Sequence, residues 1–330
     1  MKRDKRITFL SVFVILFAVA AVFLFGKAFM SMGENESPNV VQRESDGVTD
    51  LGEKEPAENG QSVDFSAQSL SMEEFNGLFS GEGSLKTERI VIEGVPVNIF
   101  FQDNLTKMPL IIMQHGLTAN KESMTDLAKS FAMQGYVVIT PDAVGYGELA
   151  DGVYRGLPEI IEGTAENFGK IIEFCGQGEY VDESRVGLCG VSMGALTSLY
   201  YSAYGEHEIK AVVSFCGTPD FASFAGMDAI ERYHSADGSS SVKDKDKIKA
   251  MEEAMTSLSP YDTLLNEKDT ALFLMCGAAD NVVPPEGNAT FYQEAIAADK
   301  KVSLVVKENQ GHTLELDEMY AALAFMVENL

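Results

Sequence analysis

The sequence predicts an α/β protein with a mostly parallel central sheet and helices on both faces. Unbroken apolar runs of strand length recur along the chain, and segments with apolar residues at helical spacing lie between them. Strands that alternate with helices form parallel sheets, because each helix carries the chain back across a face of the sheet. An alternating pattern over residues 88–102, about Glu93 and Gly94, predicts an antiparallel hairpin that opens the sheet.

The predicted elements follow one another in regular order after the hairpin. Residues 108–116 form an unbroken apolar strand, as expected in a sheet that is covered on both faces. Residues 120–135 carry apolar side chains at helical spacing. The order continues with a strand that ends at Asp142, a helix over 159–175, a strand and helix about 186–198, strands at 209–217, 271–280 and 301–312, and a closing helix at 314–330.

One long segment, residues 218–270, interrupts this order. It mixes apolar residues such as Phe221, Phe224 and Met227 with the polar stretch DGSSSVKDKDK. Connections of this length are uncommon unless they act as lids or binding loops. We therefore expect a partly helical lid insertion over a binding site; an insertion that does not contact substrate is the alternative.

The N-terminus predicts a membrane anchor. Basic residues precede an uncharged apolar run from Ile7 to Phe25 that is long enough to cross a bilayer. Because basic flanks stay in the cytoplasm, we expect residues 1–30 to form a cytoplasmic tip and an N-terminal transmembrane helix of a single-pass cell-membrane protein. A cleaved signal peptide and secretion is the alternative. Residues 31–64 predict a disordered acidic linker, and residues 65–330 the main domain outside the cytoplasm.

Composition narrows the classes of partner. The 330 residues carry a formal net charge of −25, which speaks against nucleic acid as a partner. The four cysteines include three in apolar strand-like runs, where a thiol is a small hydrophobic group, and we expect free core thiols. No C-x-x-C spacing is present, so we expect no metal and no other cofactor.

The stretch VGLCGVSMGALTS at 186–198 predicts a strand, a tight turn and a helix. Gly190, Ser192 and Gly194 form a G-x-S-x-G pattern at the turn. A serine held in a strained turn needs neighbours without a Cβ where strand, helix and substrate crowd together. Ser192 is therefore the candidate nucleophile.

A serine hydroxyl needs a base within reach and a group that orients the base. His312 follows the last predicted strand, and the carboxyl ends of parallel strands meet at one edge of the sheet. We therefore predict that His312 is the base, whereas His115 is expected to shape the turn after its own strand. Asp280, at the end of another strand, is the predicted acid, and Asp220 is its rival.

A reaction that develops negative charge on a carbonyl oxygen also needs hydrogen-bond donors for that oxygen. We predict that these are the backbone N–H groups of Met193, directly after the candidate nucleophile, and of Leu117, in the loop after a strand. Asp142, Glu148 and Arg155 lie near strand ends. They are either solvated loop residues or part of the pocket lining, and the sequence leaves both interpretations open.

Several of these segments together resemble the α/β-hydrolase superfamily, over about residues 88–330. They are MQHG at 113–116, the glycine-bearing loop after Asp142, GVSMG at 190–194, GAADNVVP at 277–284 and QGH at 310–312. The resemblance implies the α/β-hydrolase fold, a nucleophile elbow at Ser192, and the chain order Ser192, Asp280, His312. The chain is most similar to the bacterial esterase, dienelactone-hydrolase-like and prolyl-oligopeptidase-like branch.

The chain departs from this branch at two points. Dienelactone hydrolases carry cysteine at the position of Ser192. Prolyl-oligopeptidase-like peptidases usually place an oxyanion tyrosine in the loop after the third strand, where this chain has Gln114, His115 and Gly116. They also add a propeller domain, for which we expect no room in this chain. The resemblance therefore implies a serine hydrolase that acts on a small acyl substrate, foremost a carboxylic ester. An exopeptidase or amidase, and a non-catalytic binding protein on the same fold, are the alternatives.

Overall fold

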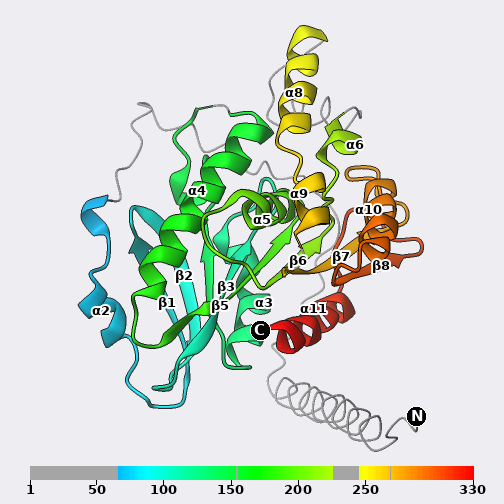
Figure 1. The fold of residues 1–330 in the computed structure, drawn as a ribbon. Coiled ribbons are helices and arrows are strands. Elements are labelled where there is room, and N and C mark those ends of the chain that lie inside the picture. The colour runs from blue at the N-terminus through cyan, green and yellow to red at the C-terminus, as the bar shows by residue number, and fades with distance from the viewer. Residues whose placement is uncertain (1–65, 154, 226–244, 268) are drawn as a thin grey trace, which may run out of the picture. The chain divides into compact units, whose positions relative to one another are not determined.

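The computed structural model describes residues 66–153, 155–225, 245–267 and 269–330 (Figure 1). The predicted anchor at 1–30 and linker at 31–64 lie outside these residues, as does the part of the predicted lid at 226–244. Within the described ranges, no helix has both the length and the apolar character needed to cross a bilayer.

The core of the fold is a sheet of eight described strands in the order β1-β2-β4-β3-β5-β6-β7-β8. The strands are β1 Leu85–Ile92, β2 Val95–Gln102, β3 Met108–Gln114, β4 Val137–Pro141, β5 Val181–Val191, β6 Ala211–Phe215, β7 Ala271–Gly277 and β8 Val302–Lys307.

The pairing confirms the predicted mostly parallel sheet with an antiparallel hairpin at its start. β1 pairs antiparallel with β2 about a turn in which Glu93 and Gly94 have φ angles of 46° and 78°. β2 also pairs antiparallel with β4, and every other pair in the sheet is parallel. β3, β4 and β7 are buried along their whole length, which explains their unbroken apolar sequences.

Helices cover both faces of the sheet. They are α2 Met72–Gly77, α3 Thr125–Ala132, α4 Leu157–Gly176, α5 Met193–Tyr204, α6 Phe221–Ala225, α8 Lys245–Ser257, α9 Tyr261–Asn266, α10 Glu286–Ala297 and α11 Leu316–Asn329. Buried side chains of α2, α4, α5, α9 and α10 belong to the apolar core on one face. Those of α3 and α11 belong to the core on the other.

The apolar pattern explains why the longer helices form and where they pack. In α4, Ile161, Ala165, Phe168, Ile172 and Cys175 recur three or four residues apart along one buried stripe. In α3, Leu127, Ala128, Phe131 and Ala132 do the same. These are the helices that the sequence indicated most clearly.

Two helices were not predicted. The six-residue α2 is held at its start by a capping box, in which Ser71 accepts from the Glu74 N–H and the Glu74 carboxylate accepts from the Ser71 N–H. Helix α10 buries few side chains, among them Phe291 and Ala295, so its apolar periodicity is weak. Short 3-10 turns also occur at Ser66–Gln68, Lys121–Met124 and Gly147–Leu149.

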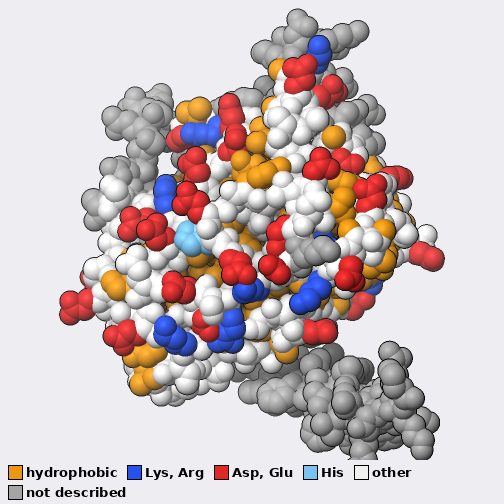
Figure 2. Space-filling view, in the orientation of Figure 1, with side chains coloured by type: hydrophobic (Ala, Val, Ile, Leu, Met, Phe, Trp, Pro, Cys, Tyr) orange, Lys and Arg blue, Asp and Glu red, His pale blue; other side chains and the backbone are white. Residues whose placement is uncertain are grey.

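All four cysteines are free and buried, as predicted for core thiols. On the face drawn in Figure 2, acidic side chains are spread over the surface and the lysines and arginines stand among them.

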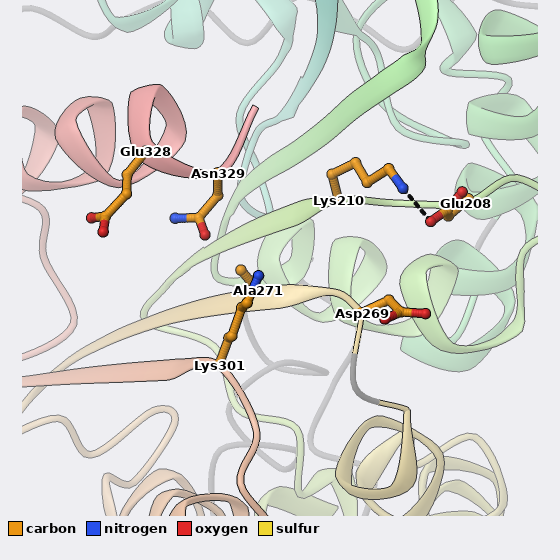
Figure 3. Close-up of a pocket in the computed structure, with 7 residues that line it drawn as sticks. All are labelled: Glu208, Lys210, Asp269, Ala271, Lys301, Glu328 and Asn329. Carbon is orange, nitrogen blue, oxygen red and sulfur yellow. Dashed lines mark hydrogen bonds and ion pairs between the residues drawn. The ribbon is translucent and has the colours of Figure 1, made fainter.

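One pocket lies where strands β6, β7 and β8 begin, beside the end of α11 (Figure 3). Its lining residues are Glu208, Lys210, Asp269, Ala271, Lys301, Glu328 and Asn329. Lys210 is paired with Glu208 within it. Ligands of open α/β sheets bind at the opposite, carboxyl ends of the strands. Ser192 lies at those carboxyl ends, directly after the last residue of β5.

Candidate active site

The strand order reverses at β3, and this reversal marks the candidate site. β4 lies on one side of β3 and β5 on the other, so the chain leaves the two neighbouring strands β3 and β5 in opposite directions. Their ends are in register, with Gln114 opposite Gly190. Ligands of open α/β sheets bind at such a switch point, which here lies between the loop that begins at His115 and the turn that carries Ser192.

Ser192 occupies a strained turn between β5 and α5. Its φ and ψ angles are 54° and −118°, a region that residues with a Cβ rarely adopt. The glycines of the motif allow it: a Cβ on Gly190 would lie 2.1 Å from the oxygen of Gly194, and one on Gly194 would lie 2.2 Å from the oxygen of Gln114. The Ser192 N–H also donates to the oxygen of Phe215 at 2.8 Å, which joins the turn to the end of β6.

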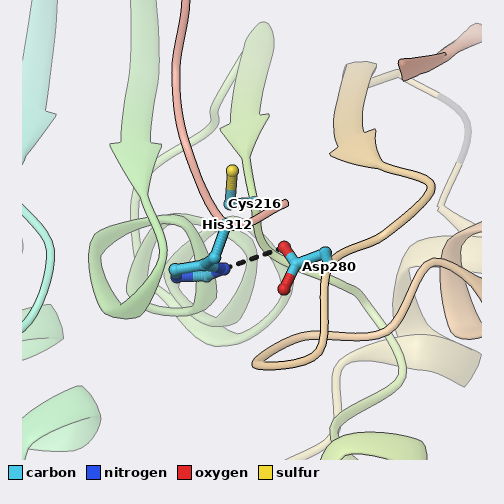
Figure 4. A group of neighbouring side chains, drawn as sticks. All are labelled: Cys216, Asp280 and His312. Carbon is cyan, nitrogen blue, oxygen red and sulfur yellow. Dashed lines mark hydrogen bonds and ion pairs between the residues drawn. The ribbon is translucent and has the colours of Figure 1, made fainter. Parts of the chain in front are cut away.

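Ser192, His312 and Asp280 are in direct hydrogen-bonding contact. His312 Nδ1 lies 2.8 Å from Asp280 Oδ2, and His312 Nε2 lies 2.8 Å from Ser192 Oγ. A carboxylate only accepts hydrogen bonds, so Nδ1 carries the imidazole proton and Nε2 accepts from the serine hydroxyl. Figure 4 shows His312 turned toward Asp280 at the strand ends. The arrangement can take a proton from Ser192.

The loop after β7 holds Asp280 in place for this contact. Asp280 Oδ1 accepts from the N–H groups of Val282 and Val283, each at 2.9 Å, and leaves Oδ2 for the imidazole. The rival Asp220 has a different role, because its Oδ1 accepts from the Ser223 N–H at 3.0 Å in the first turn of α6. Of the two candidate acids, the structure places only Asp280 against His312.

The two predicted backbone donors flank the serine. Met193 is the first residue of α5, so its N–H is among the amides at a helix start that have no partner within the helix. Gly116 lies against the turn, since a Cβ built on it would be 3.3 Å from the Val191 oxygen and 3.5 Å from Ser192 Cβ. Leu117 follows directly. Its side chain shares an apolar cluster with Met193, so the two segments that carry the predicted donors pack in one place.

His115 is fully buried and joins two loops. The Ala143 N–H donates to His115 Nε2 at 3.0 Å, so the proton is on Nδ1, which donates to the Gly116 oxygen at 2.7 Å. Burial lowers the pKa of His115, and the neutral ring that results fits both bonds. The side chain therefore shapes its turn, as the sequence suggested.

Asp142 and Glu148 belong to a buried ion network, and Arg155 to a separate pair. Lys121 Nζ lies 2.6 Å from Asp142 Oδ2 and 2.6 Å from Glu148 Oε1. Arg155 pairs with Asp151 at 2.5 Å. Neither earlier interpretation, as solvated loop residues or as pocket lining, describes Asp142, because its side chain is fully buried against Lys121. The sequence analysis missed Lys121, whose only signal is its place in a polar stretch after Leu117.

Cys216 lies beside the His312 and Asp280 side chains, and the three donor atoms lie within 4.8 Å of one another (Figure 4). Spacing alone would fit a metal ion, but the chemistry of the donor atoms does not. Burial raises the pKa of the Cys216 thiol to about 12, and the thiol donates to the Thr313 oxygen at 3.3 Å. Because cysteine binds a metal as the thiolate, and because both nitrogens of His312 are already bonded to Asp280 and Ser192, these three residues do not fit a metal centre.

An apolar cluster adjoins the serine. Its members come from α4, α5, the insertion between β6 and β7, and the loop after Asp280; they include Leu157, Ile160, Met193, Leu196, Phe221, Met255 and Val283, with Leu117, Tyr146 and Met251 packed against them. These side chains are buried against one another, so they form a packed apolar layer beside the first turn of α5. Sequence analysis anticipated the insertion but not which of its residues face the site.

Comparison with known proteins places this geometry in context. A model of the Prolyl oligopeptidase family matches residues 123–330. The putative esterase YitV of Bacillus subtilis is 28% identical over 225 residues, which are 63% of this chain and 83% of that protein. The thermostable monoacylglycerol lipase of Bacillus sp. strain H-257 is 26% identical over 220 residues, 63% of this chain and 84% of that protein.

Solved structures show the same fold. The acylaminoacyl peptidase of Pyrococcus horikoshii superimposes with a TM-score of 0.59 at 17% identity, over 74% of this chain and 41% of that one. At this identity the likeness concerns the fold, which is that of the α/β-hydrolase superfamily.

Proposed function

The chain belongs to the prolyl oligopeptidase family of serine hydrolases, and from that premise we propose that it hydrolyses carboxylic esters through an acyl-enzyme formed on Ser192. The observation that carries the proposal is the pair of 2.8 Å hydrogen bonds that link Ser192 Oγ to His312 Nε2 and His312 Nδ1 to Asp280 Oδ2. This is the geometry that activates a serine hydroxyl.

In the proposed reaction, Ser192 Oγ attacks the acyl carbonyl while His312 Nε2 takes the hydroxyl proton. The N–H groups of Met193 and Leu117 donate to the resulting oxyanion. The tetrahedral intermediate collapses when the bond to the alcohol breaks and His312 returns the proton to the leaving oxygen. Water, deprotonated by His312, then attacks the acyl-enzyme; the bond between the acyl carbon and Ser192 Oγ breaks, His312 returns the proton to Ser192 Oγ, and the acid is released. Asp280 holds the imidazole tautomer and stabilises the imidazolium without taking the proton.

Two findings favour an ester over an amide substrate. The two relatives matched over most of their length are named as an esterase and as a monoacylglycerol lipase. In the loop after β3, where prolyl-oligopeptidase-like peptidases usually carry an oxyanion tyrosine, this chain has His115, whose buried side chain is bonded to Gly116 and Ala143 and cannot take that role. The apolar cluster next to Leu117 and Met193 supports an apolar acyl or alcohol group in the substrate.

The insertion between β6 and β7 is part of the proposal. Phe221 of α6 and Met255 of α8 are fully buried in the apolar cluster with Met193. We infer that this segment acts as a lid whose side chains set the acyl preference.

The proposed location of the catalytic domain outside the cytoplasm, on a membrane tether, rests on the apolar run at Ile7 to Phe25. Fractionation of cells that express the full chain tests it, since recovery without detergent in the cytoplasmic fraction would contradict it.

Ser192→Ala tests the reaction. We expect the variant to keep its circular dichroism spectrum and to lose at least about a thousandfold in kcat against a p-nitrophenyl ester that the wild type hydrolyses. A fluorophosphonate probe should label the wild type and not the variant. Aminoacyl arylamides are assayed beside the esters, and faster arylamide turnover would favour the amidase. A wild type that neither turns over nor labels would point to a binding protein.

A further inference from the structure

The loop that carries Leu117 is tied at both ends to one other loop, residues 142–148 after β4. At its start, His115 Nε2 accepts from the Ala143 N–H at 3.0 Å. At its far end, the Lys121 N–H donates to Asp142 Oδ1 at 2.9 Å and Lys121 Nζ donates to Asp142 Oδ2 at 2.6 Å. The segment 116–120 between these ties is thus held from both sides.

The tie at Lys121 is an ion pair between two buried side chains, Lys121 and Asp142, with the partly exposed Glu148 as a further partner. Lys121 is only 1% exposed, and its ammonium lies 2.6 Å from Asp142 and 2.6 Å from Glu148, with Glu122 at 3.3 Å. Asp142 is fully buried and also accepts from the Glu148 N–H at 3.0 Å. A buried lysine that lost these carboxylates would be an unpaired charge, so its position is strongly constrained.

The network continues to the far edge of the sheet. Arg89 of β1 donates to the Glu148 carboxylate through two nitrogens, with Nε at 2.8 Å from Oε1. Hydrogen bonding from Arg89, and to a lesser extent from Lys121, lowers the pKa of Glu148 to about 2, so this carboxyl group is an anion at neutral pH. Arg89, Glu148, Lys121 and Asp142 therefore form a chain of alternating charges that ends at the loop of Leu117.

No step of the proposed reaction uses these charges. The segment they hold, however, contacts the nucleophile turn, since Gly116 lies against Val191 and Ser192. An oxyanion donor acts only when it is already aimed at the developing charge, and a displacement of about 1 Å can reduce a rate about a hundredfold.

We propose that Lys121 is a positioning residue: through Asp142 and Glu148, its buried ammonium holds the loop of Leu117 so that the Leu117 N–H is aimed at the oxyanion. This inference rests on the proposed function, because it assigns Lys121 to the same site. Lys121 itself does not touch the substrate.

The test compares Lys121→Met with Lys300→Met. Lys300 is a matched control because it is also a buried lysine, only 4% exposed. Its ammonium contacts the Thr270 oxygen at 3.2 Å and the Glu267 carboxylate at 3.4 Å. It lies near the start of β8, at the amino ends of the strands, whereas Ser192 lies at their carboxyl ends. We expect both variants to lose stability, and assays are run well below both melting temperatures. For Lys121→Met we expect kcat to fall about 10- to 100-fold with KM within about twofold, since the donor acts on the transition state.

A transition-state analogue distinguishes a misplaced Leu117 N–H from a general loss of stability. A trifluoromethyl ketone adds to the serine and forms a hemiketal whose oxyanion occupies the same donors. Its inhibition constant should rise for Lys121→Met by the factor lost in kcat, and stay within about twofold for Lys300→Met. Should Lys121→Met fail to fold, Glu148→Gln replaces it, because that side chain is partly exposed. For Glu148→Gln we expect a severalfold loss of kcat at constant KM.

The two proposals fail differently. A wild type that does not react with a fluorophosphonate overturns the serine-hydrolase proposal and this inference with it. A wild type that turns over, together with Lys121→Met or Glu148→Gln enzyme whose kcat and inhibition constant match those of Lys300→Met, overturns the role of Lys121 alone.

Discussion

At the scale of single residues, the imidazole of His312 is oriented from both sides. Asp280 uses one oxygen for two backbone N–H groups and the other for His312 Nδ1, so the carboxylate cannot rotate away. Nε2 is left as an acceptor for Ser192. Asp220 follows a neighbouring strand, yet its carboxylate accepts a hydrogen bond from the Ser223 N–H at the start of α6. The direction of each loop thus separates two carboxylates that look alike in sequence.

Asp280→Asn and Asp220→Asn test this distinction. An asparagine amide at 280 can donate to Nδ1, which favours the tautomer that lacks a base at Nε2, so we expect kcat to fall about 10³- to 10⁴-fold with little change in KM. Asparagine at 220 can still accept from Ser223, so its kcat should stay within about twofold of wild type. Ester assays on the two purified variants check this, and similar losses in both would contradict the assignment of the acid.

At the scale of elements, the turn after β4 is shaped by close packing around Asp142. Gly147 has a φ of 53°, and a Cβ on it would lie 2.1 Å from Asp142 Oδ1. Gly135, in the turn before β4, has a φ of 89° but no neighbouring atom within 4 Å of its added Cβ. The two glycines share the left-handed backbone and differ in what surrounds them.

This pair predicts two different losses of stability. Gly135→Ala should reduce the free energy of unfolding by about 1 kcal/mol, from backbone strain alone. Gly147→Ala adds displacement of the Asp142 carboxylate from Lys121, and should cost about 3 kcal/mol or more. Urea unfolding of both variants measures the difference. Equal losses would mean that the Asp142 contact adds no stability.

At the scale of the whole molecule, carboxylates stabilise the fold at neutral pH. Asp103, at the end of β2, accepts from the Ser80 hydroxyl and from the N–H groups of Ser80, Gly81 and Glu82. The hydrogen bond from the Ser80 side chain is the main reason that the pKa of Asp103 falls to about 2, and Glu148 is lowered to about 2 by Arg89 and Lys121. Both groups hold distant parts of the chain together as anions.

The sign of the pH dependence follows. The folded-state pKa values of Asp103 and Glu148 lie below the unfolded values near 4, so the native state binds fewer protons. Their contribution to stability is therefore present above about pH 4 and is lost as the pH falls toward 2. We expect the urea midpoint to decrease over that window, and Asp103→Asn to be less stable at pH 7 but to show a smaller further decrease. Parallel curves for wild type and variant would contradict this.

Much of the fold was accessible from sequence, and for a clear reason. The unbroken apolar runs of β3, β4 and β7 reflect burial on both faces, and the hairpin of β1 and β2 follows from alternation about Glu93 and Gly94. Helix α10 escaped detection because few of its side chains are buried. The turn at Ser192 could be predicted because its glycines are needed where strand and helix crowd together, a need that shows as a short local pattern in the sequence.

The sequence by itself determined most of the elements, though not α2 and α10, together with their order and the turn that presents Ser192, because these depend on spacing between neighbours in the chain. Only the tertiary structure decided that Asp280 rather than Asp220 faces His312, and that Lys121 is enclosed by Asp142 and Glu148. The physical reason is that hydrogen bonds and buried ion pairs depend on where loops from distant strands point. The spacing of residues along the chain does not predict the direction in which such a loop points.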